Sequence, residues 1–170
     1  MKYRQPKEED LIDVPKFKHV EYSKALVLLK DKSYISTVLR DMYSRITEFK
    51  EYQYVFVKVD NLKKDSLSTK VFRFHLDCEE PLKEIYDNYI FVSGNNPTLF
   101  CNEDVPFGIN NVDRYVKEKR IKTFPINTCE IHKYKSSTPH KGVKATYEHR
   151  RLLVRLSNTN IRKEKIYGNT

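Results

Sequence analysis

Hydrophobic side chains follow helical spacing in the first third of the chain. Between residues 33 and 48 the apolar positions recur at i, i+3, i+4, i+7 and i+11, on Ile35, Val38, Leu39, Met42 and Ile46. This spacing places them on one face and predicts an amphipathic helix. Ser33 is positioned to cap its N-terminus. Residues 21–30 are compatible with either a helical turn or a strand.

After Phe49 the pattern changes to β-branched and aromatic residues. Residues 54–60 read Tyr-Val-Phe-Val-Lys-Val-Asp, which is typical of a strand. Similar runs occupy residues 70–76, 89–93, 98–101, 123–135 and 150–157, and Gly94-Asn95-Asn96-Pro97 predicts a turn. We therefore expect a mainly β (α+β) fold. An N-terminal helical segment would pack on six to eight antiparallel strands, arranged as a jelly roll (double-stranded β-helix) or a related sandwich.

Length and composition limit the domain organisation. The 170 residues suffice for one domain with a core. Residues 1–20 are polar, carry Pro6 and Pro15, and are predicted to form an irregular arm, so that residues 21–170 make a single domain. Because 32% of the residues are charged and no apolar run approaches the roughly 20 residues of a membrane span, we expect a soluble protein without a membrane partner.

The N-terminus and the cysteines indicate the compartment. The first ten residues contain no apolar stretch of the kind that a secretory signal requires. The cysteines Cys78, Cys101 and Cys129 are isolated and odd in number, which predicts neither a disulfide framework nor a cysteine zinc site. Both observations favour the reducing cytoplasm.

The positive charge is concentrated towards the C-terminus. The net charge is +9, and the segment from Lys133 onward contains ten Lys or Arg residues against two Glu. Such a surface attracts anionic partners, which include nucleic acid and acidic proteins. An alternative function is therefore a small basic nucleic-acid-binding or inhibitory protein without catalytic activity, in which Tyr and Phe interleaved with Lys stack on bases.

One short motif indicates metal chemistry. His75 and Asp77 lie two residues apart in Phe-Arg-Phe-His-Leu-Asp, so that on a strand their side chains share a face. An imidazole and a carboxylate so placed can provide two ligands of a non-haem iron. A distant histidine on a neighbouring strand would complete the 2-His-1-carboxylate facial triad, which leaves positions open for other ligands.

A later histidine and arginine complete a recognisable order. His140 follows a predicted turn, 65 residues after His75, and Arg150 stands ten residues beyond His140. This order resembles the Fe(II)/2-oxoglutarate-dependent oxygenase superfamily over roughly residues 54–157. The resemblance implies that His75, Asp77 and His140 are the catalytic metal ligands, and that Fe(II), 2-oxoglutarate and O2 take part. The protein would be a dioxygenase, an oxidoreductase acting as a hydroxylase or demethylase on an unidentified substrate.

The resemblance also implies an arginine that binds the distal carboxylate of 2-oxoglutarate. A planar guanidinium pairs with a carboxylate through two hydrogen bonds. Arg150 is favoured because it shares a strand face with three apolar residues, which suggests the barrel interior. Arg151 lies within the same spacing window. Arg155 with Ser157 forms an Arg-x-Ser motif that some members of the superfamily use, and it ranks third.

Some assignments stay open at the level of sequence. His132 could replace His140 as the distal ligand, although it lies inside a predicted strand. Tyr89, Ser93 or Thr98, on strands between the two ligand motifs, could hydrogen-bond a carboxylate of 2-oxoglutarate.

Overall fold

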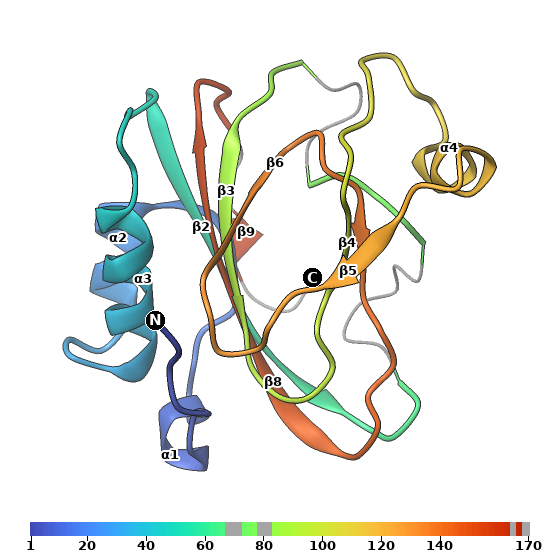
Figure 1. Ribbon diagram of the computed structural model, residues 1–170. Helices are drawn as coiled ribbons and strands as arrows, with labels where there is room; N and C mark the ends of the chain where they lie inside the picture. The colour runs from blue at the N-terminus through green and yellow to red at the C-terminus, as the bar shows by residue number, and fades with distance from the viewer. Residues whose placement is uncertain (67–72, 78–82, 164–165, 168–170) are drawn as a thin grey trace.

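Two antiparallel sheets form the body of the protein (Figure 1). The computed structural model describes residues 1–66, 73–77, 83–163 and 166–167. The larger sheet has the order β6-β3-β8-β2-β1-β9, and the smaller sheet has the order β5-β4-β7. Helices α2 and α3 cover one face of the larger sheet, whereas the smaller sheet and α4 lie on its other side (Figure 1).

The elements have the following bounds. The strands of the larger sheet are β1 (Phe17–Glu21), β2 (Tyr52–Leu62), β3 (Asp87–Val92), β6 (His132–Lys135), β8 (His149–Thr159) and β9 (Ile166–Tyr167). Those of the smaller sheet are β4 (Leu99–Cys101), β5 (Thr123–Pro125) and β7 (His140–Lys141). The helices are α1 (Glu8–Leu11), α2 (Tyr22–Leu28), α3 (Tyr34–Ser44) and α4 (Val112–Glu118).

Strand β8 is the centre of the larger sheet. It pairs with β2 from Tyr52↔Thr159 to Leu62↔His149, and with β3 on its other edge. Because successive side chains of a strand point to opposite faces, β8 divides its residues between two environments. We call the side covered by α2 and α3 the outer face and the side towards the smaller sheet the inner face.

The outer face carries the main apolar core. Leu152, Val154 and Leu156 of β8 are completely buried there. They belong to one cluster with α3, which presents the apolar face that its sequence pattern predicts. The Ser33 hydroxyl accepts a hydrogen bond from the Ser36 amide at 3.2 Å, so the predicted cap is present.

The inner face combines a smaller apolar cluster with polar residues. Its apolar cluster spans both sheets and contains Ile90, Val92, Phe100, Ile126, Tyr134 and Leu153. Two arginines of β8, Arg151 and Arg155, lie on the same face as Leu153 and are also buried or nearly so. The region between the sheets is therefore the part of the protein where charged groups are enclosed.

Most of the predicted elements are present. The mainly β, antiparallel architecture is confirmed and is compatible with a β-sandwich. The strand predicted over residues 123–135 is interrupted, because residues 126–131 connect β5 of the smaller sheet to β6 of the larger one, with Cys129 at a left-handed φ of 60°. Of the strand predicted over 70–76, residues 70–72 lie outside the described residues, and residues 73–76 form only a single bridge, at His75.

Three local predictions need correction or completion. Residues 17–20, expected in an irregular arm, belong to β1, since the buried Phe17 pairs with Val57 of β2. The undecided segment 21–30 contains α2. Helix α4 was not predicted at all, although Asn111 caps it and Val112 and Val116 bury its inner side.

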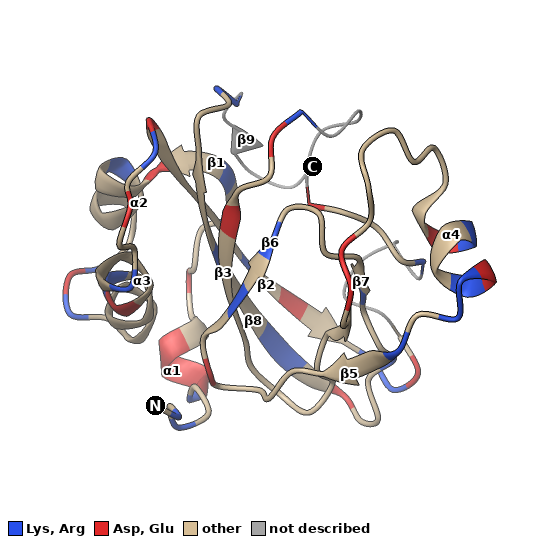
Figure 2. Ribbon diagram, turned by 45° about the horizontal axis from the view of Figure 1, so that its top comes forward, with Lys and Arg blue, Asp and Glu red and all other residues tan. Residues whose placement is uncertain are grey.

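Charged residues are spread over the fold. Figure 2 shows Lys and Arg on several elements, including α4, β6 and β8, with Asp and Glu between them on α1 and α4. Within the described part of the chain, no helix combines the length and apolar character needed to cross a bilayer. Cys101 and Cys129, the two described cysteines, are both buried free thiols.

Candidate metal centre

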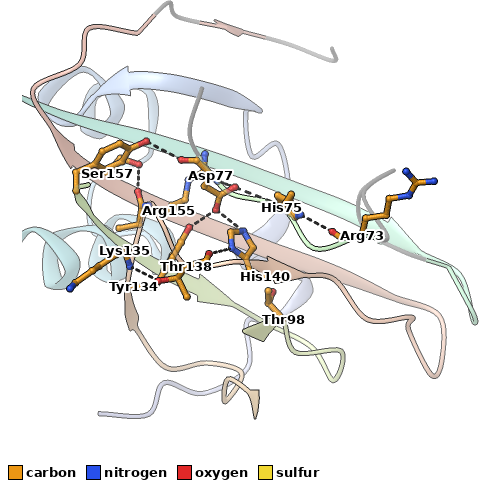
Figure 3. A network of polar contacts seen from close by, with 12 residues as sticks. Arg73, His75, Asp77, Thr98, Tyr134, Lys135, Thr138, His140, Arg155 and Ser157 are labelled. Atoms are coloured by element: carbon orange, nitrogen blue, oxygen red, sulfur yellow. Dashed lines mark hydrogen bonds and ion pairs between the residues drawn. The ribbon is translucent and has the colours of Figure 1, made fainter. Parts of the chain in front are cut away.

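A single backbone bridge brings the two halves of the centre together. The amide of His75 donates to the carbonyl of His140 at 3.0 Å, and the amide of His140 donates to the carbonyl of His75 at 3.1 Å. This antiparallel pairing places the two imidazole rings 4.4 Å apart between centroids. Asp77, two residues after His75, points to the same side (Figure 3). The pairing therefore joins residues that are far apart in the sequence.

The three side chains present their ligand atoms to one another. One ligand atom of each of His75, Asp77 and His140 lies within 4.8 Å of the others. Asp77 Oδ2 is 2.9 Å from His140 Nε2, and Asp77 Oδ1 is 3.8 Å from His75 Nε2. The His140 and Asp77 side chains are 5% and 12% exposed, whereas that of His75 is 33% exposed, so the centre opens on the His75 side.

Main-chain carbonyls fix the tautomers of both histidines. His75 Nδ1 lies 3.0 Å from the Arg73 carbonyl, and His140 Nδ1 lies 3.1 Å from the Thr138 carbonyl. Because a carbonyl only accepts hydrogen bonds, each Nδ1 carries the hydrogen. In a neutral ring the lone pair is then on Nε2, which faces Asp77. Metal-binding histidines are commonly oriented in this way by a second hydrogen bond.

The charges at the centre favour the forms that bind a metal. Burial acts to raise the pKa of Asp77, but Arg155 and His140 act more strongly in the opposite direction and hold that pKa well below its usual range. Burial and the nearby His140 lower the pKa of His75 below its ordinary value of 6.5. At neutral pH the centre thus offers an ionised carboxylate and a neutral His75 imidazole.

Two further groups bind the Asp77 carboxylate. Arg155 Nη1 lies 3.0 Å from Oδ1, and the Tyr134 hydroxyl donates to Oδ2 at 2.5 Å. Burial and Asp77 raise the pKa of Tyr134 well above its usual range, so its hydroxyl keeps its hydrogen. For Arg155, Asp77 outweighs the effect of burial, so its pKa is raised.

Aromatic rings enclose the buried side of the centre. Phe100 stacks on the His140 ring with centroids 4.9 Å apart, and Tyr134 meets the same ring edge-on at 5.3 Å. The Phe56 ring lies under the Arg155 guanidinium at 5.0 Å. These rings separate the carboxylate from water on this side, which strengthens its interactions with nearby cations.

The residues present fit a divalent metal ion. Two imidazole nitrogens and one carboxylate are the ligand set of non-haem Fe(II) sites, and the same set also binds other divalent transition metals. A neutral His140 ring sets one acceptor, Nε2, against another, Asp77 Oδ2, at 2.9 Å. Either a proton on Nε2 or a metal ion bound by both groups removes this conflict. The donor set is therefore suited to hold a cation.

Arg150, the arginine favoured on sequence grounds, lies away from the centre. It is on the outer face of β8, where its guanidinium pairs with Glu8 and donates to the Leu11 carbonyl at 3.0 Å. The inference that the apolar face of β8 is the interior that holds the site was wrong. That face is apolar because helices cover it, and the polar face is the one that points towards His75, Asp77 and His140.

Arg151 lies on the inner face and is 2% exposed. Its Nη2 donates to Thr98 Oγ1 at 3.1 Å, and Thr98 directly precedes β4, the strand that pairs with β7 at His140. Burial lowers the pKa of Arg151 to about 10. A buried guanidinium and a hydroxyl are therefore hydrogen-bonded to each other on the inner face, a combination that suits an anion-binding position.

The other predicted residues fall into two groups. Arg155, ranked third as co-substrate anchor, contacts the carboxylate of Asp77 itself. The remaining hydroxyls take part in the sheets: Ser157 donates to Asn88 Oδ1 at 2.5 Å, Ser93 Oγ accepts from the Leu152 amide at 2.9 Å, and Tyr89 packs on the outer face.

His132, the alternative distal ligand, lies near the centre without joining it. Its ring packs against Phe100 at 5.0 Å and Phe124 at 5.9 Å. The group that could hold a metal ion contains His140 instead.

Tyr134 and the direct role of Arg155 were missed by sequence reasoning. One signal was present, since residues 151, 155 and 157 place three polar side chains on one face of a central strand. A polar face on a strand that is buried on both sides requires partners and indicates a site.

No protein-family model matches the chain, and no curated protein matches it.

Proposed function

We propose that this protein is an Fe(II)/2-oxoglutarate-dependent dioxygenase whose two sheets form a double-stranded β-helix. It would hydroxylate, or by hydroxylation demethylate, an organic substrate. The observation that carries the proposal is the group of His75, Asp77 and His140, with both Nε2 atoms directed at the carboxylate and both Nδ1 atoms bound to carbonyls. Two histidines and one carboxylate leave coordination positions of a metal open for other ligands.

The metal-binding residues have distinct tasks in this proposal. When bound, Fe(II) supplies the redox chemistry that couples O2 and 2-oxoglutarate to oxidation of the substrate. Asp77 provides negative charge to hold the ion, and its low pKa keeps it ionised at neutral pH. The carbonyls of Arg73 and Thr138 keep the two imidazoles in the tautomer that binds a metal through Nε2.

Arg151 is the residue best placed to anchor 2-oxoglutarate. Its guanidinium can pair with the distal carboxylate through two hydrogen bonds, and Thr98 Oγ1 lies 3.1 Å from one of its nitrogens. Burial strengthens such a pair because little water competes for the charges. Arg150 is directed to the other side of the sheet and does not take this role.

The remaining residues exclude water and leave one approach open. Phe100 and Tyr134 cover the His140 side of the centre, and Phe56 covers Arg155. His75, which is the most exposed of the three ligands, marks the side from which a substrate would approach. An enclosed centre limits reactions with water.

Anaerobic titration tests the proposal. Wild-type protein should bind one Fe(II), and in the presence of a divalent ion it should bind 2-oxoglutarate, as followed by calorimetry. With O2 it should form succinate, as followed by NMR. His75→Ala and Asp77→Ala should abolish metal binding. Arg151→Met should weaken 2-oxoglutarate binding by about 10- to 100-fold, the usual effect of losing a hydrogen-bonded charge, with metal affinity retained.

Arg150→Met is the matched control, since it removes the same charge from the neighbouring position of the same strand. It should bind 2-oxoglutarate as the wild type does. Failure of the wild type to bind a metal, or equal effects of the two arginine variants, would contradict the proposal. A nucleic-acid-binding protein would instead show affinity for nucleic acid that falls steeply with salt and is unchanged in Asp77→Ala.

A further inference from the structure

The carboxylate of Asp77 is held on both oxygens before any metal is considered. Arg155 Nη1 lies 3.0 Å from Oδ1, and the Tyr134 hydroxyl bonds Oδ2. Both partners come from the larger sheet, Arg155 from β8 and Tyr134 from β6. Asp77, in contrast, lies in a short described segment whose only strand-like pairing is the bridge at His75. The orientation of the carboxylate therefore depends on side chains of the sheet.

Arg155 is fixed more firmly than an ordinary surface arginine. Its side chain is 11% exposed, and β8 is hydrogen-bonded on both edges at this position, opposite Phe56 and Ile90. The Phe56 ring supports the guanidinium at 5.0 Å. Taking an ion pair of this kind out of water is costly for each charge, and the cost is offset only while both partners remain together.

The charges of Asp77 and Arg155 determine the electrostatic environment of a bound metal ion. Asp77 and Arg155 together carry no net charge, so the buried pair is neutral in the absence of a metal. A divalent ion bound by Asp77 would place two cations on one carboxylate in an enclosed site, where like charges repel strongly. A doubly charged anion that binds beside the ion would remove this repulsion. The arginine thus opposes the metal alone but tolerates the metal with an anion.

We propose that Arg155 is a positioning residue that acts as the resident counter-cation of Asp77. It keeps the carboxylate oriented for metal binding in the metal-free protein. It also holds the affinity for a divalent ion alone low, so that tight metal binding requires a dicarboxylate to bind with it. The identity of that anion as 2-oxoglutarate rests on the proposed function, whereas the effect on the metal alone does not.

Metal binding without co-substrate tests the first half of this inference. The free Mn(II) signal in EPR titrations gives the dissociation constant for the wild type and three variants. Arg155→Gln removes the charge but keeps an amide that can donate to Oδ1, and it should bind Mn(II) about tenfold more tightly, because one nearby like charge is lost. Arg155→Lys keeps the charge and should bind as weakly as the wild type. Arg150→Met removes a charge from the outer face and should leave the affinity unchanged.

Coupling to the anion tests the second half. Saturating 2-oxoglutarate should tighten Mn(II) binding to the wild type by about tenfold or more, a typical size for coupling between two ligands. In Arg155→Gln this gain should be clearly smaller. By reciprocity, Mn(II) should increase the affinity for 2-oxoglutarate by the same factor in each protein, which calorimetry measures independently.

Several results would overturn the inference. Weaker Mn(II) binding by Arg155→Gln than by the wild type would show that orientation, and not charge, dominates. Equal Mn(II) affinities of Arg155→Gln and Arg155→Lys would exclude a role of charge. If Mn(II) binds and Arg155→Gln tightens it, but 2-oxoglutarate changes neither protein, the proposed function fails while the effect of Arg155 on the metal stands. No Mn(II) binding to the wild type would overturn both.

The stability of the variants is part of the test. The thermal unfolding of Arg155→Gln and Arg155→Met is measured with and without Mn(II). Folding that is lost without the metal and recovered with it supports the inference, since the ion then replaces Arg155 as the partner of Asp77. Loss of folding under both conditions would show that Arg155 is needed for the fold itself, and would overturn its assignment as a charge that a metal can replace.

Discussion

The two faces of β8 differ although both are buried. On the outer face Leu152, Val154 and Leu156 are fully enclosed by apolar neighbours from β2 and α3. On the inner face Arg151 and Arg155 are enclosed almost as completely, and each contacts a polar partner. The same strand thus supports a hydrophobic core on one side and a charged site on the other.

This difference separates stability from function within one strand. Burying apolar side chains stabilises the fold without requiring specific partners. Burying a guanidinium or a carboxylate costs free energy unless the opposite charge is placed correctly. The inner face therefore contributes less to stability than its burial suggests, and its polar residues are explained by what they bind.

The largest effect is expected from removing Asp77. Asp77→Ala leaves Arg155 buried without its carboxylate, which should lower the free energy of unfolding by about 3–5 kcal/mol, as for other broken buried ion pairs. Metal binding should be lost as well. Urea unfolding and Mn(II) titration measure the two effects. Asp77→Asn, which keeps the shape but not the charge, should also fail to bind Mn(II). A fully stable Asp77→Ala would contradict the importance of this pair.

Truncation on the outer face should affect stability alone. Leu152→Ala removes a fully buried side chain and should cost about 2–5 kcal/mol in urea unfolding. Its Mn(II) affinity, measured well below the melting temperature, should stay close to that of the wild type because Leu152 points away from the centre. Loss of metal binding by folded Leu152→Ala would show that the two faces are not independent.

A polar contact on the inner face that lies outside the centre sharpens the comparison. Ser157→Ala removes the hydrogen bond to Asn88 Oδ1 and leaves a buried acceptor without this donor. The expected loss is about 1–3 kcal/mol. Because neither residue contacts the metal-binding group, the affinities for Mn(II) and 2-oxoglutarate should be unchanged. A change in either affinity would extend the site along β8 as far as Ser157.

The last prediction concerns pH. His19 of β1 packs against Tyr54, and burial, aided by Lys163, lowers its pKa to about 3. Its folded pKa lies below the ordinary value of 6.5, so its contribution to stability is complete above pH 6.5 and is lost as the pH falls towards 3. Urea midpoints at several pH values should fall less steeply in His19→Gln than in the wild type. Parallel curves for the two proteins would exclude this role of His19.

Local patterns alone determined much of the fold. Helix α3 and its Ser33 cap follow from helical spacing and capping chemistry, and β2 and β8 follow from runs of β-branched residues. The spacing of His75 and Asp77 was sufficient to place both side chains on one side, because it depends only on the alternation of an extended chain. These features are decided by neighbours within a few residues.

Helix α4 was not predicted because its seven residues give too short a pattern to recognise.

Tertiary structure alone decided how the local elements form a site. A strand that is buried on both sides has two faces that could hold a site. The apolar face, which carries Arg150, was predicted to hold it, but the metal-binding group lies on the opposite side. Only the packing of the helices on that face shows that Arg151 and Arg155 point inward. A backbone bridge joins His75 to His140, and Asp77 is bound by Arg155 and Tyr134. These contacts join residues distant in sequence, and pairings of this kind depend on the packing of the whole chain.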